Sequence, residues 1–497
     1  MTDINPNGVL HPYPRKIDWN EGYLKIKGHV SLIIPSDLSS ETVELFLSTW
    51  ESYTQSKIKL NIISSSNSER NTFLLSTGIK LPANAKLKRG YQSALIINRN
   101  GVSASGNSET TLKHCWFSIL QLLVAGRTPE VKFYLLPFLA MHDSPRLKFR
   151  SIHLCVFPET TLGFLEKVIK LTAFMKFSHI IIEFWGTLKY ESLPELSWPQ
   201  AYTKKQIHQV LQLARQMGIQ PVPMFNHWGH AAASRDRIGR HVVLDQNPAL
   251  ESLFEADGWT WCLKNPTSLN LLKNIRAELM ELFFDTDYFH LGCDEAYSHG
   301  TCPECRKYNP GELWAEYLNS VNNHLKTYNV RPIIWGDGLL EKSKWKGYIA
   351  SSSKGRKTHE AINVLSTDFI ISDWQYGIHD KEKAATVEYF MQKGFDVITA
   401  PYSSPDNILT MANIAIEKNI MGMLLTTWNT LPLTMKVLPL TIGAMWNGTE
   451  IIHKLTQYED GYLTTVLSTY LRKLRGKSAD FKNAGWRSYE VTDMSNF

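Results

Sequence analysis

The sequence predicts an α/β protein whose main part is a (β/α)8 TIM barrel, preceded by a small α+β domain. From residue 143 to residue 445, short apolar runs alternate with longer stretches that have helical spacing. Such alternation is typical of parallel sheets, and about 250 residues of it suit a closed barrel. Eight runs are candidate strands, the number that closes such a barrel: 149–156, 179–184, 220–225, 288–292, 332–336, 369–374, 396–400 and 421–428.

Residues 1–142 follow a different order and predict the small domain. Two apolar runs between Leu24 and Ile34 predict strands. The stretches 40–53 and 110–124 have the apolar spacing of helices, and an Asn100-Gly101 turn between two strand-like runs predicts a hairpin. No acid pair stands out here, so we expect a non-catalytic domain. At the other end, residues 446–497 predict a helical segment packed on the barrel.

Composition excludes several classes of function. The 497 residues carry a net charge of only +6, with Lys and Arg scattered, so we expect no nucleic-acid partner. No apolar run reaches the roughly 18 residues that a membrane span needs, so we expect no membrane partner. The polar stretch Met1 to Arg15 lacks a secretory pattern, and the six cysteines fit buried thiols in a reducing compartment, which predicts a cytoplasmic location. The oligomeric state stays open.

Two adjacent acids, Asp294 and Glu295, follow an apolar strand in His290-Leu-Gly-Cys-Asp-Glu. Carboxylates there lose hydration energy, and the carboxyl ends of the strands are where the active sites of such barrels lie. A lone acid would be read as a capped strand end. A pair beside a glycine, at which a ligand can approach the backbone, favours two catalytic carboxyl groups with different pKa values.

Aromatic and basic side chains occur at other strand ends. His230, in Asn226-His-Trp-Gly-His, is either a satisfied structural group or a group that tunes a nearby acid, and with His227 it could ligate a metal. Arg150, at the start of the first barrel strand, is either a surface ion-pair partner or a guanidinium that reaches the mouth.

A single tryptophan usually belongs to the hydrophobic core, but several at one mouth of a barrel form an aromatic box suited to a sugar or an acetamido methyl group. The candidates are Trp185, Trp335, Trp374 and Trp428, with Asp337 as a possible supporting acid.

The clearest metal pattern is Cys302-Pro-Glu-Cys305, with His299 three residues earlier. A single Cys-x-x-Cys lacks the second pair that a zinc site usually has. The sequence therefore predicts no metal and no cofactor, and any metal at this pattern would be structural.

Together, several motifs resemble a family 20 glycoside hydrolase, a β-N-acetylhexosaminidase. They are the stretch His290 to Glu295, Tyr202-Thr followed by a helix and Gly218-Ile-Gln-Pro-Val-Pro, the Gly229-His230 pair and the tryptophan-bearing strands. The resemblance covers nearly the whole chain, including the small domain that often precedes this family's barrel. It implies an exo-acting, retaining enzyme whose substrates are glycans or glycoconjugates with terminal β-linked GlcNAc or GalNAc.

The resemblance also implies roles for single residues. Glu295 would be the general acid and then base, and Asp294 would hold the N–H of the substrate's 2-acetamido group, whose carbonyl oxygen attacks the anomeric carbon. Arg150 matches the family's sugar-hydroxyl arginine, His230 its Gly-His histidine and Tyr402 its acetamide-binding tyrosine. The acetamide-pocket tryptophans would be Trp335, Trp374 and Trp428.

Two positions depart from the family's pattern. Many members carry an aspartate after the second strand, where this chain has Ile182-Glu-Phe-Trp, so Glu183 is a candidate partner for His230. Many also end the last strand Trp-x-Glu, whereas this chain has Trp428-Asn-Thr, which leaves the contacts to the sugar 4- and 6-hydroxyls open. The alternative function is therefore a sugar-binding protein that has impaired catalysis on the same barrel. The choice between GlcNAc and GalNAc is open as well.

Overall fold

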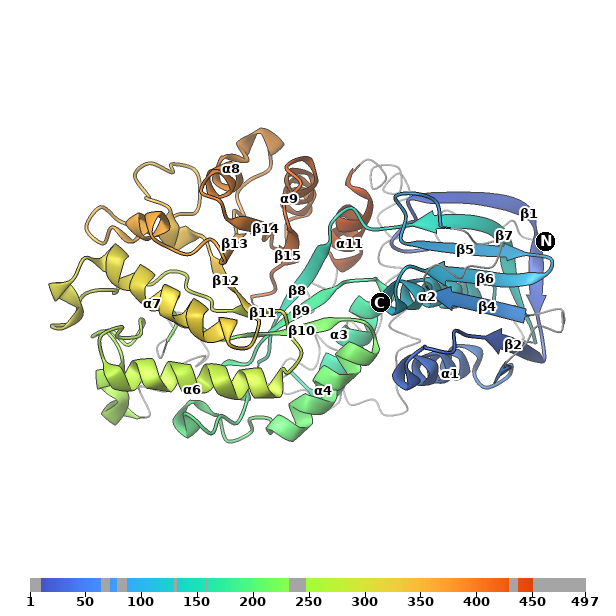
Figure 1. Cartoon of the computed structure of the whole chain (residues 1–497), viewed down its shortest axis with the longest axis horizontal. Helices are drawn as coiled ribbons and strands as arrows, with labels where there is room; N and C mark the ends of the chain where they lie inside the picture. The colour runs from blue at the N-terminus through green and yellow to red at the C-terminus, as the bar shows by residue number, and fades with distance from the viewer. Residues whose placement is uncertain are drawn as a thin grey trace.

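The computed structural model describes residues 10–63, 72–77, 87–128, 132–157, 160–231, 247–428 and 437–449. Two domains lie side by side, the first built on an open sheet and the second on a closed barrel (Figure 1). Within these ranges, no helix combines the length and apolar character that crossing a membrane requires. Most of the predicted C-terminal helical segment, and the residues just after Trp428, lie outside the described residues.

The first domain is a mixed sheet with two helices packed on it. Its elements are β1 (Lys16–Ile26), β2 (His29–Ile33), α1 (Ser40–Thr54), β3 (Lys59–Ile62), β4 (Thr72–Thr77), β5 (Ser93–Asn98), β6 (Gly101–Gly106), α2 (Glu109–Ala125) and β7 (Tyr134–Asp143). The strand order is β1-β7-β5-β6-β4-β2-β3. The first four strands of this order pair antiparallel, and the last three continue the sheet in parallel (Figure 1).

Capping side chains set where the two helices begin. Ser39 and Ser108 are the N-caps of α1 and α2, and each side chain accepts a hydrogen bond from the backbone N–H three residues later. The helices predicted over 40–53 and 110–124 are therefore confirmed. The predicted hairpin is confirmed too, because β5 and β6 pair antiparallel around a turn at residues 99–100.

The second domain is a barrel of parallel strands with helices outside it. Its elements are β8 (Phe149–Cys155), α3 (Leu162–Phe174), β9 (His179–Glu183), α4 (Lys204–Gln216), β10 (Gln220–Met224), α6 (Pro266–Leu282), β11 (Tyr288–His290), α7 (Pro310–Lys326), β12 (Arg331–Trp335), β13 (Ile370–Asp373), α8 (Ala385–Gln392), β14 (Asp396–Thr399), α9 (Pro405–Glu417) and β15 (Gly422–Leu425). Each strand pairs with the next, and β15 closes the barrel on β8. The predicted (β/α)8 barrel and preceding α+β domain are thereby confirmed. One connection departs from the pattern, because β12 and β13, which are joined by fully described residues, have only short 3-10 turns between them.

Apolar side chains fill the barrel. Residues such as Ile181, Val222, Ile333 and Ile370 form one buried interior cluster. Trp335, the last residue of β12, belongs to this cluster, and the tryptophans that follow β13 and β15 pack against it. Since a filled barrel has no room for a ligand along its axis, a site has to be built from the loops at the carboxyl ends of the strands.

One buried carboxylate connects the two domains. Asp143, the last residue of β7, accepts hydrogen bonds from the backbone N–H of Arg15 at 3.1 Å and from the indole N–H of Trp446 at 2.7 Å. The ammonium group of Lys176, which lies between α3 and β9, is 3.3 Å from its other oxygen, and both side chains are at most 2% exposed. Trp446 belongs to α11 (Leu438–Asn447). The first domain, the barrel and α11 therefore meet at this ion pair.

Asp143→Asn should lower the free energy of unfolding by about 3–5 kcal/mol, because it leaves the buried Lys176 ammonium without a counter-charge. The side-chain amide oxygen of the asparagine can still accept the N–H groups of Arg15 and Trp446, so the loss of stability measures the effect of the missing charge. Urea unfolding followed by circular dichroism measures this effect.

Two variants control the interpretation. Asp143→Asn combined with Lys176→Met removes both charges and should recover most of the stability. Asp396→Asn, which breaks a half-exposed pair with Arg331, should cost at most about 1 kcal/mol. Equal stability of Asp143→Asn and the unaltered protein would show that the buried pair has no energetic role.

Candidate active site

The acid pair lies on a turn of left-handed backbone directly after β11. Neighbouring side chains of an extended strand point to opposite faces, so two consecutive acids would normally diverge. Here Gly292, Cys293 and Glu295 have φ values of 67°, 72° and 48°. The turn brings both carboxylates to the same partner, because His230 Nε2 is 3.2 Å from Asp294 Oδ2 and 3.4 Å from Glu295 Oε2.

Positive φ is unfavourable for residues other than glycine, so this turn depends on its surroundings. The backbone N–H of Glu295 donates to Asp337 Oδ2 at 3.1 Å, and its carbonyl accepts the indole N–H of Trp259 at 2.7 Å. Two glycines permit the close packing. A Cβ at Gly229 would lie 2.0 Å from the Asp294 carbonyl oxygen, and one at Gly292 would lie 1.9 Å from the Asn226 side-chain oxygen.

His230 is the positive charge of the site. Its backbone is also left-handed, with φ of 57°, and its ring lies 4.4 Å from that of Trp259. Burial alone would lower the pKa of His230, but the carboxylates of Asp294 and Glu295 outweigh burial and raise it to about 10. His230 is therefore an imidazolium at neutral pH. His227 is separate from this group, because its Nδ1 donates to the Phe225 carbonyl at 2.6 Å.

The two carboxylates differ in their surroundings. The Asp294 side chain is 9% exposed, and its Oδ1 has no hydrogen-bond donor among the described residues. Glu295 is 32% exposed, and its Oε1 accepts the hydroxyl of Tyr297 at 2.6 Å. Burial and this bond to Glu295 raise the pKa of Tyr297. Asp294 is thus placed to accept an N–H from a ligand, whereas Glu295 is open to exchange a proton.

Asp337 links the turn that carries Asp294 and Glu295, which we call the acid turn, to the aromatic residues. Its Oδ2 holds the Glu295 backbone, and its Oδ1 accepts the indole N–H of Trp374 at 3.0 Å. Burial, followed by the nearby Asp294 carboxylate, raises the pKa of Asp337 to about 7. One side chain therefore fixes both the turn that carries the acids and one face of the site beside them.

The predicted aromatic residues come together around Tyr376, which sequence reasoning did not single out. The rings of Trp335 and Trp428 are 5.3 Å apart, and the indole N–H of Trp428 donates to the Tyr376 hydroxyl. The Tyr376 ring lies 5.2 Å from Trp374 and 5.6 Å from Tyr402. We call these five residues the aromatic wall. Trp185, the fourth predicted tryptophan, lies 6.3 Å from the ring of His230 instead.

Arg150 does not belong to this site, so the prediction that it reaches the mouth is wrong. It lies near the amino end of β8, and its guanidinium donates to the carbonyls of Leu147, Lys148 and Lys176, which all precede barrel strands. The guanidinium also lies 5.0 Å from the Trp446 ring, at the junction between the domains. The alternative of a surface ion pair is equally wrong, because the side chain is buried.

Glu183 is close to the site but does not contact His230, which corrects that prediction. It ends β9, and its Oε2 lies 3.1 Å from His153 Nε2. Its Oε1 accepts the side-chain N–H of Asn226 at 2.7 Å. Since Asn226 starts the loop that carries His230, Glu183 supports the loop rather than the histidine.

Three site residues were missed by the sequence analysis. Tyr297 and Tyr376 each lie two residues beyond a predicted site residue, so their proximity along the chain was a usable signal. Trp259 comes from the long connection between β10 and α6, whose sequence has no strand or helix periodicity that would place it. Only the folded chain brings it to Glu295.

The metal pattern also needs a correction. His299 is not part of a cysteine group, because its Nε2 donates to the Pro310 carbonyl at 2.9 Å and its ring lies 5.1 Å from that of Trp228. Instead, Cys262 and Glu255 join the two cysteines of the pattern. Within the part of the chain that the structure describes, two further groups have metal-ligating side chains, namely His153, Cys155 and Glu183, and His230 with the acid pair.

Comparisons with known proteins agree with this geometry. The family model described as the catalytic domain of glycosyl hydrolase family 20 matches residues 182–489. Hexosaminidase D from Bos taurus is 24% identical over 48% of this chain and 66% of its own length. A β-hexosaminidase from Vibrio furnissii is 23% identical over 66% of this chain and 54% of its own length. Each match therefore leaves a third or more of the relative uncovered.

Solved structures support the fold at lower identity. A family 20 β-N-acetylhexosaminidase from Streptomyces coelicolor superposes with a TM-score of 0.68 at 15% identity, covering 96% of this chain and 98% of its own. A chitobiase from Flavobacterium johnsoniae gives a TM-score of 0.72 at 18% identity, covering 99% and 75%. Because the family model covers more than half of the sequence, from the end of β9 onward, the chain belongs to glycosyl hydrolase family 20.

Proposed function

We propose that this glycoside hydrolase is an exo-acting, retaining β-N-acetylhexosaminidase that releases terminal β-linked GlcNAc or GalNAc. The observation that carries the proposal is the convergence of two consecutive carboxylates on the charged His230, beside the aromatic wall. Family membership and the names of the hexosaminidase relatives support the same activity.

The difference between the carboxylates supports substrate assistance. In this mechanism the acetamido carbonyl oxygen of the substrate, rather than a protein carboxylate, bonds to the anomeric carbon. Asp294 accepts the acetamido N–H with its unpartnered oxygen and opposes the positive charge that develops on the substrate. Glu295, the more exposed acid, handles the protons.

The reaction has two steps. In the first, Glu295 gives its proton to the glycosidic oxygen as the bond to the anomeric carbon breaks, and the acetamido oxygen closes a five-membered oxazolinium-type ring. In the second, the Glu295 carboxylate takes a proton from water, whose oxygen attacks the anomeric carbon and reopens the ring. Two displacements at one carbon retain the β configuration.

The neighbours of the acids make this proton transfer possible. With His230 charged and Asp294 ionised, a protonated Glu295 leaves this group of three side chains neutral, which limits the cost of burying it. The four partly exposed members of the aromatic wall, Trp374, Tyr376, Tyr402 and Trp428, offer apolar surface to the acetamido methyl group and the sugar face, and the fully buried Trp335 packs against Trp428. The hydrogen bond from the Trp374 indole to Asp337 fixes the position of this aromatic surface relative to the acid turn.

Glu295→Gln should lower kcat/KM by about 100-fold or more on a β-linked GlcNAc disaccharide, because the leaving sugar needs a proton. The loss should be smaller on a nitrophenyl glycoside, whose leaving group needs little protonation. Asp294→Asn should cost about 100-fold on both substrates, since it removes the charge opposite the intermediate.

Glu304→Gln is the matched control for these variants. Glu304 is an exposed carboxylate on the same connection, 63% exposed and paired with Lys307. This variant should keep wild-type kinetics. Unchanged turnover in Glu295→Gln, or binding of GlcNAc by calorimetry without turnover in the unaltered protein, would instead favour a sugar-binding function.

Substrate assistance itself has a direct test. A nitrophenyl β-glucoside, which has a 2-hydroxyl group in place of the acetamide, should not be cleaved, because it brings no nucleophile. A thiazoline analogue of the intermediate should inhibit competitively. Comparable rates on the glucoside and on the GlcNAc glycoside would require a protein nucleophile and exclude this mechanism. The same assay on GlcNAc and GalNAc glycosides gives the sugar preference.

The charge on His230 predicts a pH dependence of stability. Its pKa in the folded protein, about 10, exceeds the ordinary value of 6.5, so its contribution is complete below pH 6.5 and is lost as the pH rises through 10. His230→Asn should therefore lower the free energy of unfolding most near pH 6 and least above pH 10. Urea unfolding across this range measures the difference. A stability difference between His230→Asn and the unaltered protein that grows as the pH rises would contradict the proposed charge.

A further inference from the structure

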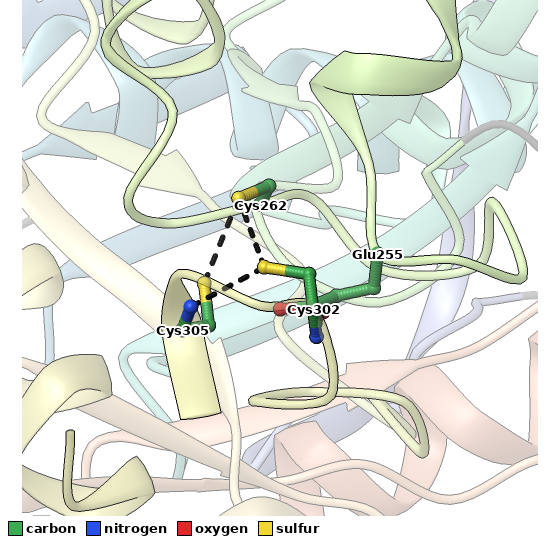
Figure 2. A group of neighbouring side chains, drawn as sticks. All are labelled: Glu255, Cys262, Cys302 and Cys305. Atoms are coloured by element: carbon green, nitrogen blue, oxygen red, sulfur yellow. Dashed lines mark hydrogen bonds between the residues drawn. The ribbon is translucent and has the colours of Figure 1, made fainter. Parts of the chain in front are cut away.

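Four side chains from two separate loops, which follow β10 and β11, converge on one another (Figure 2). Glu255 and Cys262 come from the connection between β10 and α6, and Cys302 and Cys305 come from the segment that follows the acid pair. Their candidate ligand atoms all lie within 4.8 Å of one another. None of these side chains takes part in the proposed reaction.

The sulfur positions match a tetrahedral metal site. Cys262 Sγ is 3.6 Å from Cys302 Sγ and 3.6 Å from Cys305 Sγ (Figure 2). Zinc binds thiolate sulfur at about 2.3 Å, so two sulfurs of one tetrahedron lie about 3.8 Å apart. Disulfides would leave one of the three thiols unpaired, whereas one metal ion uses all three.

A backbone N–H group also points at one sulfur of the cluster. The N–H of Cys305 donates to Cys302 Sγ at 3.3 Å. A hydrogen bond to an ionised acceptor is stronger than one to a neutral acceptor, so this donor suits a metal-bound sulfur at Cys302.

Glu255 adds a second, independent observation. Its side chain is fully buried, and its carboxylate accepts hydrogen bonds from the N–H of Gly300, the hydroxyl of Thr301 and the N–H of Cys302. Among the described residues, no Lys, Arg or His lies within ion-pair distance of it. Buried carboxylates are otherwise paired with a cation or bound to a metal.

We propose that Cys262, Cys302, Cys305 and one carboxylate oxygen of Glu255 bind a structural zinc ion. Three thiolates with one oxygen suit zinc, and all four positions are taken by the protein, as in sites that stabilise a fold rather than activate water. Binding displaces the thiol protons to solvent and involves no oxidation or reduction.

The ion would join the two loops that hold Glu295. Between Glu255 and Cys262 lies Trp259, whose indole N–H donates to the Glu295 carbonyl, and between Glu295 and Cys302 lies Tyr297, which donates to the Glu295 carboxylate. A zinc ion at the cluster therefore fixes both contacts from one side. It acts on catalysis only by holding these loops.

The first test uses the unaltered protein. Purified without chelators, it should contain one zinc ion per chain by mass spectrometry of the metal, and a mercurial reagent that reacts with thiols should release that ion stoichiometrically. Replacement by Co²⁺ should give thiolate charge-transfer bands and the strong visible bands of tetrahedral cobalt. Protein that takes up neither ion, or that contains a Cys262 disulfide when isolated under reducing conditions, would overturn the proposal.

Variants then assign the ligands. Cys262→Ser should lose the bound zinc, whereas Cys115→Ser, which changes a buried thiol of α2 in the other domain, should keep it. Glu255→Gln should weaken zinc retention against a chelator and alter the visible cobalt spectrum. Full zinc content in Cys262→Ser would refute the site. If Cys262→Ser does not fold, the mercurial and cobalt measurements on the unaltered protein still show whether the four side chains bind a metal ion. None of these readouts depends on hydrolase activity.

Discussion

The arrangement of the site depends on one backbone constraint, the left-handed turn that follows β11. Consecutive side chains in a strand diverge, yet Asp294 and Glu295 both have to meet His230. Three residues with positive φ achieve this, and two of them are not glycine. The strain of such a turn persists only where the surrounding structure fixes it. Much of what lies around the acid pair serves this purpose: the Gly229 contact, the Asp337 carboxylate and the Trp259 indole.

These supports come from successive strands of the barrel, which explains why the fold suits the site. His230 follows β10, the acids follow β11, Asp337 follows β12 and Trp374 follows β13. Parallel strands place all these ends at one rim, so residues far apart in the sequence become neighbours. The charged and apolar groups at this rim have different roles. The charged His230 balances the carboxylates, Asp337 titrates near neutrality under burial and the Asp294 charge, and the aromatic wall supplies apolar surface next to them.

Two buried polar clusters outside the site hold its framework. The Asp143–Lys176 pair joins the first domain to the barrel at the amino ends of the strands, and Arg150 lies against Trp446 there. The cysteine cluster lies at the opposite rim, in the same loops after β10 and β11 that contact Glu295. In each of them a buried carboxylate, Asp143 or Glu255, needs fixed partners, because an unpaired buried charge costs free energy.

The sequence by itself determined the barrel, the helices of the first domain and the acid pair, because periodicity and strand ends are local properties of the chain. It also placed Arg150 at the start of a strand, which in a parallel barrel is the end away from the mouth, but the length of the side chain left a position at the mouth open and the family resemblance then favoured it. The tertiary structure decided the partners: Glu183 with His153 and Asn226, Tyr376 within the aromatic wall, and Cys262 rather than His299 beside Cys302 and Cys305. These contacts join loops without periodicity, and their geometry follows from how the strands bring the loops together, which no local pattern encodes.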